Sequence, residues 1–303
     1  MVNTVHNRYF PGGITVNPLE NFNQERVVKL HNAVSAQELG TGAYEGKRIN
    51  VSSSTMEHLQ LAQETLRKVK MMLPYGAGNQ KVEMIYTGGE SSARALMHRE
   101  KSSQDAPIPN SRQAARYQAG NCEETSDLSY ALLAQKRINA PVLLVGDSDW
   151  DHKYVLIGDP RDQNWGERNT VVVDPWARYP SAATLDQTIR RNPYPGAEYQ
   201  RARNADPLPG AQALNSIRHV TTAEVAHYLA EENLPSIGAD FLEWFSQSDV
   251  TADMFDEKTV ARDPSTRYST HMFNAKSMDD IAQPTVSRQR AAQHAWDNSA
   301  YRW

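Results

Sequence analysis

Cysteine is almost absent from this chain, and long apolar runs are absent altogether. Cys122 is the single cysteine among 303 residues, which excludes an intramolecular disulfide and a zinc site built from several cysteines. No stretch approaches the roughly 20 apolar residues that a membrane-spanning helix needs. The formal net charge of −4 provides no general attraction to nucleic acid or to an anionic membrane. We therefore expect a polar protein with no membrane span and no nucleic-acid partner.

The patterns of a signal peptide and of common cofactor-binding motifs are also missing. The N-terminus lacks the basic and then apolar stretch of a signal peptide. We therefore expect the chain to be made in the cytoplasm and to leave it, if at all, by another route. The sequence has no glycine-rich phosphate loop and no H-E-x-x-H motif. His219 and His227 share a helical pattern but have no carboxylate at ligand spacing. The sequence thus predicts no cofactor and no metal.

The stretch from Gln118 to Trp176 carries three reactive side chains in a defined order. Cys122 opens a helical pattern, His152 stands where an apolar strand begins, and Asp174 closes a run of three valines. Each of them therefore lies at the edge of a regular element. A thiol nucleophile needs a base that takes its proton and a carboxylate that orients the base. The order Cys, His, Asp therefore predicts a catalytic triad.

The surroundings of Cys122 favour a reactive thiol. Asn121 is a good helix cap, and apolar residues follow at helical spacing from Leu128 onward. Cys122 is thus expected at a helix N-terminus, where unpaired N–H groups and the helix dipole stabilise an anion and can bind an oxyanion. Glu123 and Glu124 add negative charge to the first turn and oppose a thiolate. A neighbouring imidazolium has to outweigh them.

Two predicted strands carry the other two triad members. The apolar runs P-V-L-L-V and K-Y-V-L-I are separated by the turn sequence G-D-S-D. This pattern is typical of a β-hairpin with His152 at the start of its second strand. A third strand ends at Asp174, because Pro175 has no N–H for the ladder. Asp159 is the alternative third member, although its neighbours, a glycine and a proline, favour a turn.

These motifs resemble those of papain-like cysteine hydrolases. The match rests on G-N-C followed by a helix, on D-H-K-Y-V in a strand and on V-V-D-P-W in the next strand, over residues 112–178. It is closest to compact bacterial effector and toxin enzymes, including glutamine deamidases, and the transglutaminase-like group has the same order. The resemblance implies that Cys122 is the nucleophile, His152 the general base and Asp174 the residue that orients the base.

One position departs from the papain pattern. Papain has an oxyanion-hole glutamine six residues before its cysteine, whereas this chain has Arg116 there. Gln118 and Gln113 lie nearby but out of register. The sequence offers Gln118, Asn121 and Trp176 as candidates for oxyanion or substrate binding. Trp176 stands two residues after the third triad member and faces the same side of an extended chain. It is expected either to cover the His–Asp pair or to pack in the core.

We divide the chain into three parts. Residues 1–50 have few apolar clusters, which predicts a loosely ordered N-terminal segment compatible with an export signal. Residues 51–250 are expected to form the papain-like catalytic domain, and residues 251–303 a polar C-terminal extension. Ser54 and Glu57 are expected to cap the first long helix. Outside the triad stretch the sequence predicts helices over 54–73, 91–99, 221–234, 237–245 and 288–296, a strand over 81–87 and an irregular, proline-rich loop over 192–210.

The expected fold is α+β. Its papain-like core packs the helix of Cys122 on an antiparallel sheet that carries His152 and Asp174, with extra N- and C-terminal helices. The resemblance implies a bacterial effector-like thiol hydrolase, either a glutamine deamidase or a cysteine protease. Such a protein is made in the bacterial cytoplasm, is exported without a cleaved signal peptide, and attacks an amide of a host protein through a thioester.

Two alternatives remain open. A transglutaminase or acyltransferase would use the same triad, with an amine in place of water. The alternative from another class is a non-catalytic module, in which the triad stretch is a core hairpin and the C-terminal helices bind a partner protein.

Overall fold

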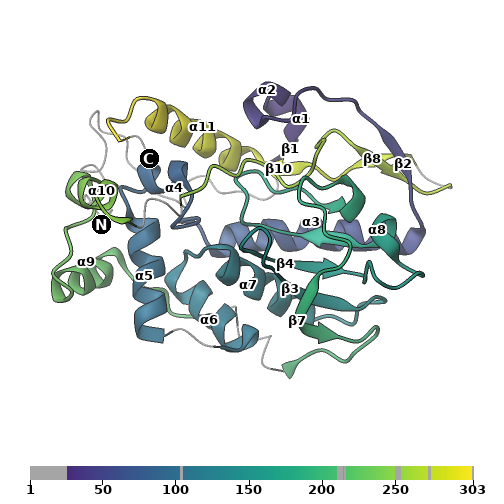
Figure 1. Ribbon diagram of the computed structural model, residues 1–303, viewed down its shortest axis with the longest axis horizontal. Coiled ribbons are helices and arrows are strands. Elements are labelled where there is room, and N and C mark those ends of the chain that lie inside the picture. Colours follow the sequence, from purple (N-terminus) through teal and green to yellow (C-terminus); the bar gives the residue numbers. More distant parts are fainter. Residues whose placement is uncertain are drawn as a thin grey trace.

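The computed structural model describes residues 26–301 except 103–104, 210–213, 215, 250–253 and 272–273. Within these residues the chain forms a mixed α+β fold, as expected, in which a sheet lies beside a group of helices (Figure 1). The sequence assigns a possible export signal to residues 1–50, and the first 25 of these lie outside the described part.

A five-stranded antiparallel sheet forms the centre of the fold. Its strands, in spatial order, are β6 (Ala183–Thr184), β5 (Val171–Val173), β4 (His152–Ile157), β3 (Val142–Asp147) and β7 (Gly196–Arg201). β3 and β4 pair along their full length, with Asp147 opposite His152 at one end. The predicted hairpin is therefore confirmed. The predicted strand before Asp174 is confirmed as well, because β5 pairs with β4.

Both faces of this sheet are buried, because apolar side chains stand at consecutive positions of β3, β4 and β5. On one face, Leu144 and Val155 share a core with α3 (Ser53–Met72) and α7 (Cys122–Ala134). On the other face, Leu156 belongs to a second apolar cluster. Successive residues of a strand point to opposite faces, so the continuous apolar runs of the sequence supply both cores at once.

Helix α3 is the long helix predicted over 54–73, but it begins earlier. Its N-cap is Ser52, whose hydroxyl accepts a hydrogen bond from the N–H of Thr55 at 3.0 Å. The predicted cap at Ser54 is wrong, since Ser54 already lies inside the helix. Residues 52–54 are all serine, so the side-chain chemistry alone does not distinguish the capping residue. The extended backbone at Ser52 does.

Helices make up the other side of the molecule. Three of them, α5 (Glu90–Ser102), α9 (Thr222–Glu231) and α10 (Ala239–Ser246), share a core that includes Phe241. The helices predicted over 91–99, 221–234 and 237–245 are thus confirmed, with shifted ends. A further helix, α6 (Pro107–Tyr117), packs against α7.

The strand predicted over 81–87 is wrong. These residues form helix α4 (Lys81–Tyr86), which packs against α11 (Gln283–Asp297). The apparent alternation arises because Glu83 interrupts an apolar run, but Glu83 is as buried as its neighbours. Its carboxylate accepts a hydrogen bond from Gln289 Nε2 of α11 at 2.6 Å. A distant helix therefore satisfies the polar residue that the pattern places on a solvent face.

The loop predicted over 192–210 is also wrong in part, because residues 196–201 form the edge strand β7. This strand pairs with β3 on one side, and most of its residues are exposed. An edge strand of this kind lacks the apolar alternation by which strands are recognised.

Segments from the two ends of the chain pair with each other. Strand β1 (Val27–Lys29) is antiparallel to β10 (Asp280–Ala282), and β2 (Arg48–Asn50) is parallel to β8 (Arg267–Ser269), which also pairs with β9 (Lys276–Ser277). Short helical segments complete the described elements: α1 (Leu30–Ala33), α2 (Ala36–Leu39), α8 (Gly166–Asn169) and η2 (Leu185–Gln187). None of the described helices combines the length and apolar character needed to cross a membrane.

Candidate functional site

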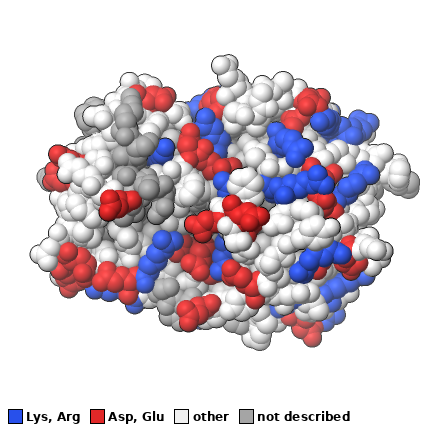
Figure 2. All heavy atoms as spheres, in the orientation of Figure 1, with Lys and Arg blue, Asp and Glu red and all other residues white. Residues whose placement is uncertain are grey.

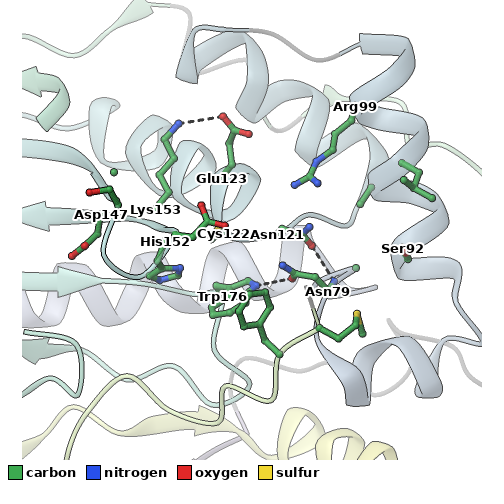
Figure 3. A pocket seen from close by; sticks show the side chains of 18 of the residues that line it. Asn79, Ser92, Arg99, Asn121, Cys122, Glu123, Asp147, His152, Lys153 and Trp176 are labelled. Carbon is green, nitrogen blue, oxygen red and sulfur yellow. Dashed lines mark hydrogen bonds and ion pairs between the residues drawn. The ribbon is translucent and has the colours of Figure 1, made fainter. Parts of the chain in front are cut away.

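A cavity of about 590 Å³ lies where one end of the sheet meets the helices (Figure 3). Cys122, His152 and Trp176 all line it. The strands β3, β4 and β7 form one side of the cavity, and α5 and α10 contribute to the other. Figure 3 shows the side chains of Cys122 and His152 next to each other between these two sides.

Cys122 is the first residue of α7, as the sequence predicts. The turn before it is tight, because a Cβ on Gly120 would lie 2.3 Å from the Cβ of Glu124. The N–H of Asn121, the N-cap of the helix, donates to Glu124 Oε2 at 2.7 Å. The thiol of Cys122 is free and partly exposed, so a molecule in the cavity can reach it. The N-terminus of a helix favours an anion at this position.

His152 and Asp174 are in direct contact. His152 Nε2 lies 2.7 Å from Asp174 Oδ2, and both side chains are buried. The contact follows from the sheet, because His152 opens β4 and Asp174 comes directly after β5, the antiparallel neighbour of β4. Since Nε2 faces the carboxylate, Nδ1 is the ring nitrogen that remains for Cys122.

Opposing effects set the charge of His152. Burial lowers the pKa of the imidazole. The negative charge of Asp174, together with hydrogen bonds to Asp174 and Cys122, outweighs burial and raises the pKa of His152 to about 10. The ring is therefore an imidazolium at neutral pH in this arrangement. An imidazolium beside a sulfur stabilises the thiolate form, which is the nucleophilic form of cysteine.

Asp159, the alternative third member, is occupied elsewhere. Its carboxylate forms two hydrogen bonds of 2.8 Å with the guanidinium of Arg161. Hydrogen bonding to Arg161 lowers the pKa of Asp159. The structure thus places Asp174, and not Asp159, next to His152.

Trp176 covers His152 and forms a hydrogen bond with Asn79, a residue that the sequence pattern does not single out. Its ring covers His152, with 4.9 Å between the ring centroids, and its indole Nε1 donates to Asn79 Oδ1 at 3.0 Å. The N–H of Asn79 donates in turn to Asn121 Oδ1 at 3.1 Å. An indole N–H can only donate, so the amide oxygen of Asn79 must face Trp176. The NH₂ group of Asn79 then points away from the indole, and Asn79 lines the cavity.

Both glutamates that follow Cys122 are paired with cations. Lys153 Nζ lies 3.3 Å from Glu123 Oε1, and Arg99 Nε lies 3.2 Å from Glu124 Oε1. The negative charge that opposes a thiolate in the sequence is therefore compensated by neighbours from other elements. The ion pair of Lys153 with Glu123 also connects β4 to α7 directly beside Cys122 and His152 (Figure 3).

Gln118 is not brought to the cavity, unlike Asn121 and Trp176. It is the C-cap of α6, with a φ of 60°, and its side chain is buried. Arg116, at the position of the papain glutamine, lies in the last turn of α6 with its guanidinium near the ring of Tyr117. It does not line the cavity either.

Asn79, Lys153 and Arg99 are the site residues that sequence reasoning misses. Asn79 lies in a glycine-containing turn after α3. The glycines of this turn are the sequence signal for a close backbone approach at Asn79. A Cβ on Gly78 would lie 2.8 Å from the Cα of Ser92, so the backbone there must run close to α5. Lys153 and Arg99 carry no such signal, because a charged residue in a strand or a helix normally faces solvent.

The described residues contain no group of three or more His, Cys, Asp or Glu side chains that could hold a metal ion. Comparison of the chain with protein-family models, with curated proteins and with solved structures finds no match.

Proposed function

We propose that this protein is a papain-like cysteine hydrolase that acts on an amide of a protein substrate through a thioester. The observation that supports this most is the 2.7 Å contact between His152 Nε2 and Asp174 Oδ2, in the wall of the cavity that holds the Cys122 thiol. A buried His–carboxylate pair whose other ring nitrogen meets a thiol is the arrangement that activates a sulfur nucleophile.

Before the substrate reacts, the Cys122 thiol has given its proton to Nδ1 of His152, so the reaction starts from a thiolate beside an imidazolium. The thiolate sulfur then forms a bond to the carbonyl carbon, and the π electron pair of the C=O group moves to oxygen. When the C=O bond forms again, the C–N bond breaks and the imidazolium gives its proton to the leaving nitrogen. A water molecule, deprotonated by His152, attacks the thioester, which releases the acid and restores Cys122.

Asn79 and the first turn of α7 supply the donors for the oxyanion. The indole of Trp176 fixes the orientation of the Asn79 amide, which leaves the NH₂ group free to donate into the cavity. The backbone N–H of Cys122 lies at the helix N-terminus, where it has no partner within the helix. In other enzymes the loss of one such donor lowers kcat by about 10²–10³. Asn79 thus takes the role that papain gives to the glutamine replaced here by Arg116.

The proposal extends to the biological role through the resemblance of the motifs to effector and toxin enzymes. The protein is then a bacterial effector that is exported and modifies a host protein. Attack on a glutamine side chain releases ammonia and leaves a glutamate, whereas attack on the main chain yields two peptides. Resolution of the thioester by an amine instead of water would make the protein a transglutaminase.

The test is a comparison of the products made by the wild-type protein and by Cys122→Ala. Each is incubated with an extract of eukaryotic cells in the presence of a biotin-labelled amine, and the proteins are analysed by mass spectrometry. Deamidation exchanges an amide for an acid, proteolysis creates new termini, and transamidation attaches biotin. We expect one class of product with the wild type alone. Identical products from both proteins would contradict the proposal.

A further inference from the structure

We infer that the substrate segment has an apolar side chain on one side of the reacting amide and a lysine or arginine on the other. This inference rests on the proposed function, because it concerns the two ends of the cavity that holds Cys122. The cavity of about 590 Å³ extends to both sides of the thiol, from Asp147 at one end to Ser92 and Arg99 at the other (Figure 3). It therefore has room for neighbours of the reacting group.

The end formed by the helices is mainly apolar. Five apolar side chains line it: Ala95, Leu96, Phe245, Met254 and Phe255. Phe255 packs edge-on against Trp176, with 5.1 Å between the ring centroids, so this apolar surface continues to the residue that covers His152. Arg99 also lies on this side, but its charge is paired with Glu124. An apolar side chain gains most from binding here, because it removes this surface from water.

The end formed by the sheet is acidic. Three carboxylates line it: Asp147 of β3, Asp151 of the β3–β4 turn and Glu198 of β7. The basic residue on this side is Lys153. Its Nζ forms ion pairs with carboxylate oxygens of Glu198 at 2.8 Å, of Glu123 at 3.3 Å and of the buried Asp127 at 3.8 Å. Carboxylates thus outnumber the ammonium group, and this end keeps an excess of negative charge. Figure 2 shows acidic side chains in the middle of the face where Figure 1 places the β3–β4 turn.

The location of this charge is what makes it selective. A negative charge in a cleft with protein on both sides attracts a cation more strongly than the same charge on an open surface, and it repels an anion. A lysine or arginine bound at the sheet end would compensate the excess carboxylates. A glutamate in the same place would add a further unpaired anion next to Asp151, which is exposed. If the substrate segment bound in the reverse orientation, its lysine or arginine would lie against the apolar end. The cation would lose its hydration there and would gain no carboxylate partner in return.

The test uses small covalent probes, so that no natural substrate is needed. Each probe is a tripeptide whose central residue carries a chloroacetamide on its side chain. The two flanking residues are Leu and Lys (the Leu–Lys probe), Leu and Glu (the Leu–Glu probe), or Ser and Lys (the Ser–Lys probe). Each probe is made with its two flanking residues in either order along the chain. The Cys122 sulfur displaces chloride, so a C–S bond forms as the C–Cl bond breaks. The rate of labelling is followed by intact mass, with iodoacetamide as the reference reagent.

We expect one order of the Leu–Lys probe to label Cys122 roughly tenfold faster than the Leu–Glu probe of the same order, and faster than its Ser–Lys counterpart. Glu198→Gln should reduce the ratio of Leu–Lys to Leu–Glu rates by about threefold. Each rate is divided by the iodoacetamide rate of the same variant, which removes any effect of Glu198 on the reactivity of Cys122. Glu45→Gln is the matched control, because Glu45 is paired with Lys47 at 2.8 Å and does not line the cavity.

The reference reagent separates the two claims. Equal rates for the Leu–Lys and Leu–Glu probes, with a Cys122 that iodoacetamide labels faster than a free thiol, would overturn the substrate inference and leave the proposed function standing. Equal rates for the Leu–Lys and Ser–Lys probes would overturn its apolar half. If iodoacetamide labels Cys122 no faster than a free thiol, the proposed function fails, and the inference fails with it.

Discussion

His152 is the side chain on which the proposed chemistry depends most, because three groups meet at its ring. Asp174 accepts a hydrogen bond from one nitrogen, Cys122 meets the other, and Trp176 covers the face. Burial by itself would remove the charge from the imidazole. The carboxylate of Asp174 reverses this effect, so it decides which protonation state the ring has next to the sulfur.

This dependence leads to a prediction for Asp174→Asn. The asparagine side chain is similar in size but has no negative charge, so the fold should be retained while the His152 imidazolium loses its stabilising partner. Turnover of the substrate should fall by a large factor, up to about 10⁴. The measurements are turnover and circular dichroism of the purified variant.

Asp159→Asn is the matched control, because the carboxylate of Asp159 binds Arg161 rather than His152. It should leave turnover within about twofold of the wild type. An inactive Asp159→Asn together with a fully active Asp174→Asn would assign the third triad role to Asp159.

At the scale of elements, the geometry of the site depends on the first turn of α7. This turn is closely packed, and it also contacts the turn that carries Asn79. Gly120 allows the carboxylate of Glu124 to fold back onto the N–H of Asn121. The side chain of Asn121 then holds the backbone of Asn79. The absence of a side chain at Gly120 therefore helps to position both Cys122 and Asn79, the proposed oxyanion donor.

Gly120→Ala should disturb this arrangement. The new Cβ would lie 2.3 Å from the Cβ of Glu124, so the first turn of α7 has to shift. We expect a loss of about 1–3 kcal/mol in the free energy of unfolding, measured by urea denaturation, and slower alkylation of Cys122. Gly196→Ala is the control, because its Cβ would meet a single atom, Gly146 O, at 3.6 Å. Equal stability and equal alkylation rates for the two variants would contradict this account of α7.

The sequence predicts the elements whose signals are local. The helix that Cys122 opens, the hairpin of His152 and the strand before Asp174 are each encoded by a short apolar pattern with turn residues at its ends. The papain-like assignment stays a prediction. Helix α4 and strand β7 are not recognised, since long-range contacts decide their structure: α11 satisfies Glu83 of α4, and β3 pairs with an edge strand of mainly exposed residues.

At the scale of the whole molecule, the cavity exists because two parts of the fold meet there. The sheet brings His152, Asp174 and the acidic residues, while the helices bring the apolar end, and Cys122 lies at the junction. No local pattern reveals this junction. Asn79 reaches the site through hydrogen bonds to Trp176 and to Asn121, and both partners are distant in the sequence. The excess negative charge of the cavity depends equally on distant residues, such as Glu198 on the edge strand.

The central claim is that His152 and Asp174 activate Cys122, and the pH dependence of Cys122 alkylation by iodoacetamide tests it most directly. The rate is measured by intact mass for the wild type and for His152→Ala, with Cys122→Ala as the blank. With a pKa of about 10, the imidazolium places a positive charge beside the sulfur at every pH below about 10, which includes pH 6.5. At pH 6.5 the wild type should therefore react at least about tenfold faster than a cysteine in an unstructured peptide. His152→Ala should lose this advantage and should reach the wild-type rate only as the pH approaches about 8.5, where an unperturbed thiol ionises. A wild-type rate at pH 6.5 that equals that of the peptide, or that is unchanged in His152→Ala, would contradict the account.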